Sequence, residues 1–228
     1  MTRPTVDDLI EDVADIVQDT SQTSDDDKII RLFNDAMYKL ANNIFIPDLR
    51  TVGQISTIIT PVNTNVVALP TNFHKNLTTC YNVTKKTHVQ VYNSRFLIDR
   101  RLRDLNKAGS VIAVSKDGSN LYYQKIPTTV EVLQISYYKK PEDVSITDPT
   151  YLPDNIFSNL LINYACWRLY SKIEDGIEGE KVNTIYHKSE FNEAYAEAKM
   201  FFGPEEDEPY VPLKGDTILN NFNFDSLM

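Results

Sequence analysis

Apolar residues in the first part of the chain recur with the spacing of a helix that buries one face. Between Val6 and Val17 they fall every three or four positions, and five carboxylates occupy the other side. This pattern predicts an amphipathic helix. Thr5, followed three residues later by Asp8, is typical of the capping box that begins such a helix.

A second helical series starts just after Ser24 and runs to Ile44. The hydroxyl of Ser24 is expected to cap this helix, and the three aspartates that follow favour the positive end of its dipole. Pro47 marks its end. With the polar segment Asp19–Ser24 between them, the two helices are expected to form an antiparallel pair.

Beyond Pro47 the pattern changes to period two and to short β-branched runs, which predict strands. We expect seven of them, at Gln54–Thr60, Asn65–Leu69, Thr78–Val83, His88–Tyr92, Val111–Val114, Leu121–Lys125 and Val130–Tyr138. A short basic helix is expected to interrupt the strands at Ser94–Lys107. The pair Asp117–Gly118 lies between two apolar runs and predicts a tight hairpin.

Helical spacing returns in the last third of the chain. Asn155–Ile173 and Val182–Phe202 predict two more helices, with Gly176 and Gly179 breaking the pattern between them. The expected core positions of the last helix are Ile185, Phe191, Tyr195, Ala198 and Phe202. Gly203–Pro204 then stops it.

These elements together predict a mixed α+β fold. Residues 1–50 and 151–203 are expected to form an antiparallel helix bundle of two N-terminal and two C-terminal helices. Residues 51–150 are expected to form an inserted β-rich subdomain that carries the short basic helix. An extended C-terminal arm, residues 204–228, completes the chain.

The arm has neither helical nor alternating period, yet it is too apolar for a merely solvated tail. Its candidate partner-binding residues are Tyr210, Val211, Leu213, Ile218, Leu219, Phe222, Phe224 and Leu227. Either the arm packs back on its own domain, or it orders on another chain and adds contact area there. The Gly-Pro stop and the acidic spacer that follows it favour the second alternative, because they detach the arm from the last helix.

Charge is spread unevenly along the 228 residues, whose net charge is −9. Residues 1–27 carry −8 and residues 204–228 carry −5, so the body between them is mildly basic at +4. Because the field of the whole molecule repels phosphates, strong nonspecific binding of free DNA is disfavoured. A local basic strip can still face phosphates.

A basic strip within the expected short helix is the candidate charged interface. It consists of Arg95, Arg100, Arg101 and Arg103. Arginine presents a planar fork that suits phosphate or carboxylate. The alternative is ordinary pairing of these arginines with acids of the same or a neighbouring chain.

The sequence contains no recognisable catalytic or metal-binding motif. The three histidines are isolated, and Cys80 and Cys166 lie far apart without a Cys-x-x-Cys partner, so we expect buried free thiols and no cofactor. An enzyme is the least favoured class. With no run of eighteen apolar residues and an acidic beginning, we expect neither a membrane span nor a secretory signal, and we expect a cytoplasmic product.

The order of these elements resembles the head-to-tail adaptor proteins in the neck of tailed bacteriophages, particularly short-tailed ones. Four runs carry the resemblance and are spread over most of residues 24–202. They are I-I-R-L-F-N-D-A-M-Y-K-L-A from Ile29, V-V-A-L-P-T-N-F-H-K at Val66–Lys75, Y-Y-K-K-P-E-D-V-S at Tyr137–Ser145, and L-P-D-N-I-F-S-N-L-L-I-N-Y-A-C-W-R-L-Y at Leu152–Tyr170.

The resemblance implies a structural protein of the virion neck, without catalytic residues to carry over. It implies a homo-oligomeric ring, dodecameric in the family, that binds the portal protein and a tail or nozzle protein. DNA would meet the ring only in transit through its channel, and no membrane is involved. Two alternatives stay open: another neck or tail ring component such as a stopper or terminator, and a nucleic-acid-binding regulator that reads through Arg95–Lys107. The acidic termini count against the regulator.

Overall fold

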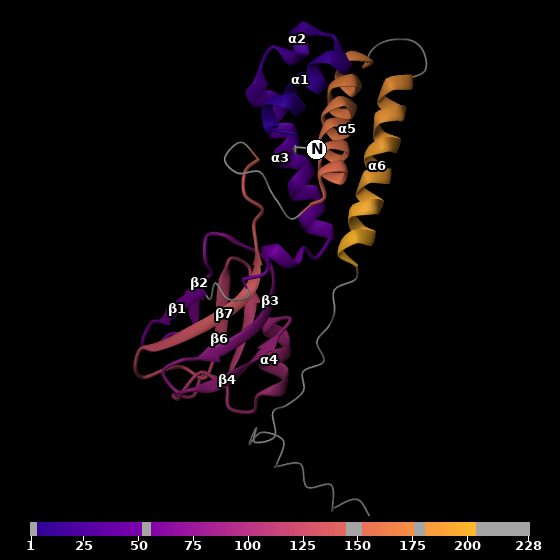
Figure 1. Cartoon of the computed structure of the whole chain (residues 1–228). Coiled ribbons are helices and arrows are strands. Elements are labelled where there is room, and N and C mark those ends of the chain that lie inside the picture. The colour runs from indigo at the N-terminus through magenta and orange to yellow at the C-terminus, as the bar shows by residue number, and fades with distance from the viewer. Residues whose placement is uncertain (1–3, 52–55, 145–151, 176–180, 204–228) are drawn as a thin grey trace, which may run out of the picture.

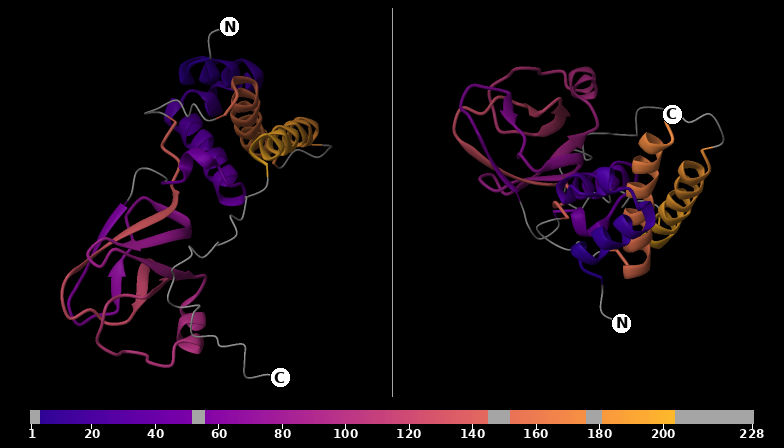
Figure 2. Two further views of the ribbon diagram at one scale, coloured as in Figure 1. Left: turned by 60° about the horizontal axis from the view of Figure 1, so that its bottom comes forward. Right: turned by 90° about the horizontal axis from the view of Figure 1, so that it is seen from above.

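Helices and strands occupy opposite ends of the molecule (Figures 1 and 2). The structure is a computed structural model that describes residues 4–51, 56–144, 152–175 and 181–203. The helical end contains α1 (Val6–Val17), α2 (Thr20–Thr23), α3 (Asp26–Asn43), α5 (Asp154–Ile173) and α6 (Val182–Phe202). The sheet end contains seven strands and α4 (Arg95–Arg101). The fold is therefore of the mixed α+β class, as the pattern predicts.

The central element of the helical end is α5, against which α1, α3 and α6 all pack. Its buried residues are Ile156, Phe157, Leu160, Leu161, Tyr164, Ala165, Cys166 and Leu169. A helix with neighbours on several sides needs apolar residues around most of its circumference, so α5 is less one-sided than α1. The two N-terminal helices make most of their contacts with α5 rather than with each other.

The beginning of α1 confirms the expected capping box. The Thr5 hydroxyl accepts a bond from the Asp8 N–H at 3.2 Å, and the Asp8 carboxylate accepts one from the Thr5 N–H at 2.7 Å. The expected cap at Ser24 is wrong. Because α3 starts at Asp26, the capping position belongs to Asp25, whose carboxylate makes no cap bond and lies 3.6 Å from Arg31.

The segment between α1 and α3 is not only a polar connection, since it forms the four-residue helix α2. Asp19 organises its first turn. The backbone N–H and the hydroxyl of Ser21 both donate to Asp19 Oδ1, at 2.9 and 2.6 Å. Side chains of this kind commonly satisfy the free N–H groups at the start of a helix.

The seven strands form one sheet in the order β1-β7-β3-β4-β5-β6-β2. Their bounds are β1 Ser56–Thr60, β2 Val66–Ala68, β3 Phe73–Asn82, β4 Thr87–Tyr92, β5 Ala113–Asp117, β6 Asn120–Gln124 and β7 Glu131–Lys139. All neighbours are antiparallel except β4 and β5, which are parallel. The first and last strands of this order also contact each other, so the sheet curls until it is nearly closed.

Two details of the strands test the sequence pattern. The expected hairpin is confirmed: Asp117 pairs with Asn120 across the β5–β6 turn, where Gly118 adopts a φ of +62° that suits glycine. The third strand begins at Phe73 and not at Thr78, because shifts in its pairing with β7 interrupt the alternation of apolar and polar residues.

Each end has its own hydrophobic cluster, and a few contacts join them. The sheet cluster is made of Ile58, Cys80, Val89, Val111, Val114, Leu121, Tyr123, Leu133, Ile135 and Tyr137. The helical cluster runs from Leu9 to Ala198 and takes in Tyr138 at the end of β7. At the junction the Phe45 and Tyr138 rings lie 5.3 Å apart, and Lys75 Nζ donates to the Ile44 carbonyl at 2.8 Å.

Candidate interaction surface

The helix α4 packs on the outside of the sheet end beside β4 and β5. Ile98 is its fully buried residue and packs with Tyr92, Ala113 and Tyr122. With one face anchored in this way, the arginines of α4 lie on the exposed side of the helix. The short basic helix expected from the sequence is therefore present in this part of the chain.

The helix is shorter than the expected Ser94–Lys107, because the chain leaves it at Leu102. From there the chain continues as a loop that hydrogen-bonds to β6. The Asn106 N–H donates to Gln124 Oε1 at 2.8 Å, and Gln124 Nε2 donates to Asn106 Oδ1 at 3.0 Å. Arg103 consequently lies in this loop and not on α4.

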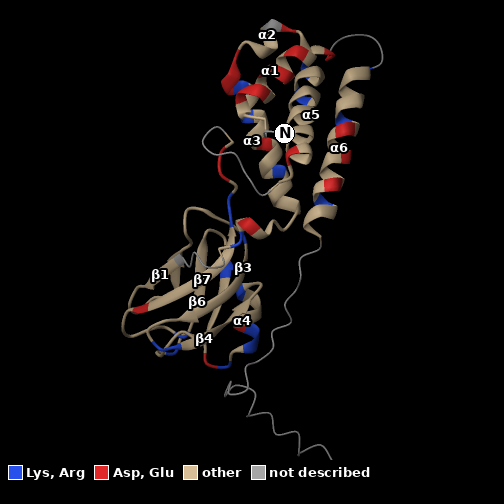
Figure 3. Ribbon diagram, in the orientation of Figure 1, with Lys and Arg blue, Asp and Glu red and all other residues tan. Residues whose placement is uncertain are grey.

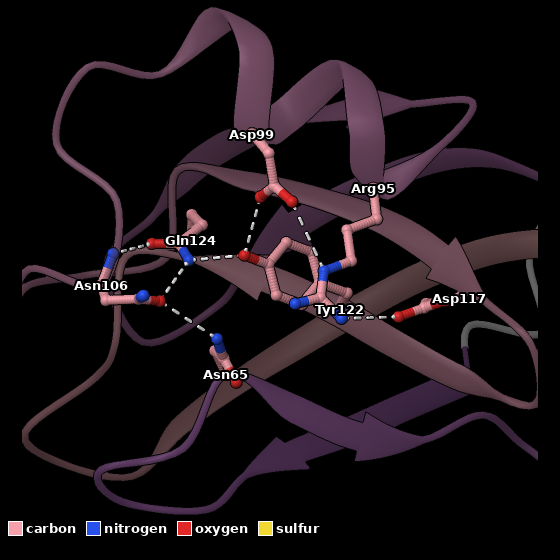
Figure 4. A network of polar contacts seen from close by, with 7 residues as sticks. All are labelled: Asn65, Arg95, Asp99, Asn106, Asp117, Tyr122 and Gln124. Carbon is pink, nitrogen blue, oxygen red and sulfur yellow. Dashed lines mark hydrogen bonds and ion pairs between the residues drawn. The ribbon is translucent and has the colours of Figure 1, made fainter.

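A polar network holds α4 against β6 (Figure 4). The Tyr122 hydroxyl donates to Asp99 Oδ1 at 3.0 Å and accepts from Gln124 Nε2 at 2.7 Å. Asn65 extends the network to the segment before β2, because its Nδ2 donates to Asn106 Oδ1 at 3.3 Å. Burial, the largest cause, raises the pKa of Tyr122 and keeps its hydroxyl available as a donor.

Arg95 is fully engaged inside its own chain. Its Nη1 lies 3.1 Å from Asp117 Oδ2 and its Nε lies 3.5 Å from Asp99 Oδ2. Its guanidinium carbon also lies 4.4 Å from the centre of the Tyr122 ring. Pairing within the chain, one of the two alternatives for the basic strip, thus describes Arg95.

The other three arginines are in a different situation. Arg100, Arg101 and Arg103 are exposed, and none forms an ion pair with a carboxylate in the described part of the chain. Arg101 makes only a distant contact with the Tyr92 ring, 5.9 Å from its centre. Phe96, on the same helix, is 68% exposed. We call Phe96, Arg100, Arg101 and Arg103 the α4 surface.

Charge separates the two ends of the molecule (Figure 3). Residues 56–144 contain twelve Lys and Arg against six Asp and Glu, whereas residues 4–51 contain four against eleven. The α4 surface therefore belongs to a basic end, and α1 belongs to an acidic one. The basic character of the body is thus concentrated in the contiguous residues 56–144, which carry +6, whereas the whole body between the acidic ends carries +4.

Groups that serve catalysis elsewhere have structural partners here. His187 is buried, stacks on the Tyr170 ring at 5.4 Å and places Nδ1 2.9 Å from Asn163 Oδ1; burial lowers its pKa. Cys80 and Cys166 are buried free thiols, as expected, and burial raises the pKa of each to about 12.

The described residues contain no group of three or more His, Cys, Asp and Glu side chains placed to hold a metal ion.

A hollow of about 380 Å³ lies between Tyr38 and the segment Lys140–Asp143, and Thr71 and Asn72 complete its lining. Among the helices that the structure describes, none is long and apolar enough to cross a membrane.

The apolar residues of the expected arm, Tyr210 to Leu227, lie outside the described residues. Their role remains the prediction made from the sequence. Within the described part, sequence reasoning missed Phe96 and the Tyr122 network. The spacing of Arg95 and Asp99, four residues apart, was a visible sign that one arginine of the strip pairs on its own helix.

Comparison with known proteins identifies the class of molecule to which this geometry belongs. The family model of the SU10 adaptor protein, which describes phage head-to-tail adaptors, matches residues 4–212. The chain belongs to this family. The match spans the helical end, the sheet end with its α4 surface, and the first residues of the expected arm, and it confirms the resemblance drawn from the sequence. No curated protein matches the sequence.

Proposed function

We propose that this SU10-family adaptor works by assembly rather than catalysis. Copies of the chain form a ring in the virion neck, join the portal to the tail, and leave a channel for the passage of DNA. The observation that carries the proposal is the family match over residues 4–212, which includes all the described helices and strands.

The two ends divide the work in this proposal. Residues 1–50 and 151–203 act as the helical domain, and residues 51–150 act as the inserted β-rich domain. Their separate hydrophobic clusters support the division. An elongated subunit with two distinct ends suits a connector, because such a protein must present different surfaces to the portal protein on one side and to a tail or nozzle protein on the other (Figure 2).

Two charged features also fit a connector. The net charge of −9 allows DNA to slide through a channel without adhering to its wall. The α4 surface, with three arginines that lack a described acidic partner, acts as a protein interface for carboxylates of a neighbouring component. The arm, residues 204–228, orders on a partner chain and adds apolar contact area.

Native mass spectrometry of the chain, alone and mixed with a candidate portal ring, tests the proposal. Discrete addition of about a dozen copies only in the mixture is the expected result, because head-to-tail contacts between identical subunits then close a ring on the portal. Failure to associate with the portal, together with tight binding to duplex DNA, would contradict it and favour a nucleic-acid-binding regulator.

A further inference from the structure

Three cations from three different helices converge on one tryptophan in the helical end. Lys39 Nζ of α3 lies 4.9 Å from the centre of the Trp167 ring. Lys188 Nζ of α6 lies 5.6 Å from it, and the guanidinium carbon of Arg168 lies 5.8 Å from it. We call Lys39, Arg168 and Lys188 the cation cluster. All three side chains are exposed, so the cluster faces the surroundings of the molecule.

Aromatic rings explain part of this arrangement. Lys39 Nζ also lies 5.0 Å from the centre of the Phe191 ring and 5.7 Å from that of Tyr164. Cations are attracted to the faces of aromatic rings, so each cation of the cluster has a favourable contact. The rings do not, however, remove the repulsion between the cations themselves.

No anion of the described chain neutralises the cation cluster. None of its members forms an ion pair with a described carboxylate. The pKa of Lys39 is lowered, first by burial and then by the positive charges of Arg168 and Lys188. Cations held close together in this way favour an anionic partner, and carboxylates make charge-assisted hydrogen bonds with both lysine and arginine.

Helix α1 carries negative charges that no described cation neutralises, whereas the cation cluster carries positive ones. Asp7 and Asp8 lie in the first turn, where capping and the helix dipole explain them. Glu11, Asp12 and Asp15 have no such explanation: they are exposed and form no ion pair with a described residue. Asp15 even lies in the last turn, where the helix dipole disfavours a negative charge and where no basic residue is present.

We propose that the cation cluster binds Glu11, Asp12 and Asp15 on α1 of a second copy of the chain. The inference rests on the proposed function, because a closed ring of identical subunits needs two different and complementary surfaces on each subunit. Residues 11 and 15 lie one turn apart, about 6 Å along the helix, so their carboxylates can bridge neighbouring cations. This contact is the lateral interface of the ring.

Carbodiimide cross-linking tests the contact directly, because the reagent joins a lysine amine only to a carboxylate that touches it. The full chain is used as an equal mixture of ordinary and nitrogen-15 material, alone and with a portal ring. The expected products join Lys39 or Lys188 to Glu11, Asp12 or Asp15, with mixed isotope pairs that prove contact between copies. Any of three results would overturn the proposal. The lysines could be joined to Glu205–Glu208 instead, the cross-links could form only within one copy, or neither sample could give cross-links.

Charge reversal supplies an independent test. Lys39→Glu with Lys188→Glu makes the cluster acidic, and Glu11→Lys with Asp15→Lys makes α1 basic. We expect copies of either variant alone to associate with one another at least about tenfold more weakly than copies of the natural chain, because like charges then face each other. An equal mixture of the two should recover association, since each reversed surface meets its complement on the other variant. Undiminished association of the single variants would overturn the proposal.

Controls separate this result from unfolding and from the proposed function. Lys85→Glu with Lys86→Glu changes the net charge by as much as the cluster variant, at the exposed β3–β4 turn, and should associate normally. Circular dichroism confirms that every variant is folded. If copies cross-link to one another through α1 but never bind a portal, the lateral contact stands and the function of joining the portal to the tail falls.

Discussion

The Tyr122 hydroxyl donates a hydrogen bond to the Asp99 carboxylate over 3.0 Å and thereby joins the middle of α4 to β6. The same hydroxyl accepts from Gln124, which in turn holds the loop at Asn106. One side chain thus connects the helix, the strand and the loop that carries Arg103. The orientation of the α4 surface depends on this group.

Removing that hydroxyl should loosen α4 without unfolding the sheet. Tyr122→Phe leaves Asp99 and Gln124 each short of one partner, so we expect a loss of about 1–2 kcal/mol in the free energy of unfolding. Urea denaturation measures this loss, and hydrogen exchange should quicken in Arg95–Arg101 but not in β7. Tyr81→Phe is the matched control, because that tyrosine is only partly buried and forms no described hydroxyl bond. Equal effects of the two substitutions would refute the role of the network.

Stability should decline as the pH falls below 6.5. Burial lowers the pKa of His187 below its ordinary value of 6.5, so beneath that pH the unfolded chain binds a proton that the folded chain does not. The expected slope is at most about 1.4 kcal/mol per pH unit for one histidine. His74 contributes in the same direction, since burial lowers its pKa as well.

Denaturation curves between pH 7 and 5 check this expectation. His187→Gln should reduce the slope without abolishing it, because His74 remains. The exposed His88 provides the control, and His88→Gln should leave the slope nearly as in the natural chain. A slope that His187→Gln leaves unchanged would show that this histidine does not couple protonation to folding.

The sequence pattern predicted those helices and turns that depend on residues close together in the chain. The bounds of α1 follow from its capping box and its one apolar face, and the β5–β6 hairpin follows from Asp117–Gly118. The expected core position Ile185 is wrong, as it is 64% exposed, because apolar residues of α6 lie on its outer face as well as its inner one. Pattern alone does not tell which of two apolar faces meets a neighbouring helix.

Long-range contacts explain most of the remaining differences. The early end of α4 depends on hydrogen bonds between Asn106 and Gln124, which lie 18 residues apart in sequence. The cation cluster brings together residues 39, 168 and 188, and no spacing within a single helix reveals it. In the candidate surface, the sequence identified the arginines, and the spacing of Arg95 and Asp99 hinted at one pairing, but only the fold shows that Arg95 also meets Asp117 while the other three form no ion pair with a described residue.

Deleting residues 204–228 should leave a folded, soluble protein that no longer joins its partner. The buried members of the three hydrophobic clusters of the described helices and strands lie within residues 9–198, and Gly203–Pro204 separates the arm from the last helix, so we expect the cores to form without the arm. Circular dichroism and thermal unfolding should therefore match the full chain. In native mass spectrometry, the truncated chain should fail to add to a portal ring. Normal docking would show that the arm is not the partner-binding segment.

Replacing Arg100, Arg101 and Arg103 with Ala decides between adaptor and nucleic-acid-binding regulator. A regulator that reads DNA through these residues would lose an affinity that depends steeply on salt, because each phosphate contact releases counterions. For an adaptor, we expect weak duplex binding before the change and little to lose after it. The fold should survive, because these side chains form no described ion pair, whereas Arg95→Ala disturbs the pairing with Asp117 and Asp99. Fluorescence anisotropy with duplex DNA, measured across a range of salt concentrations, distinguishes the two functions.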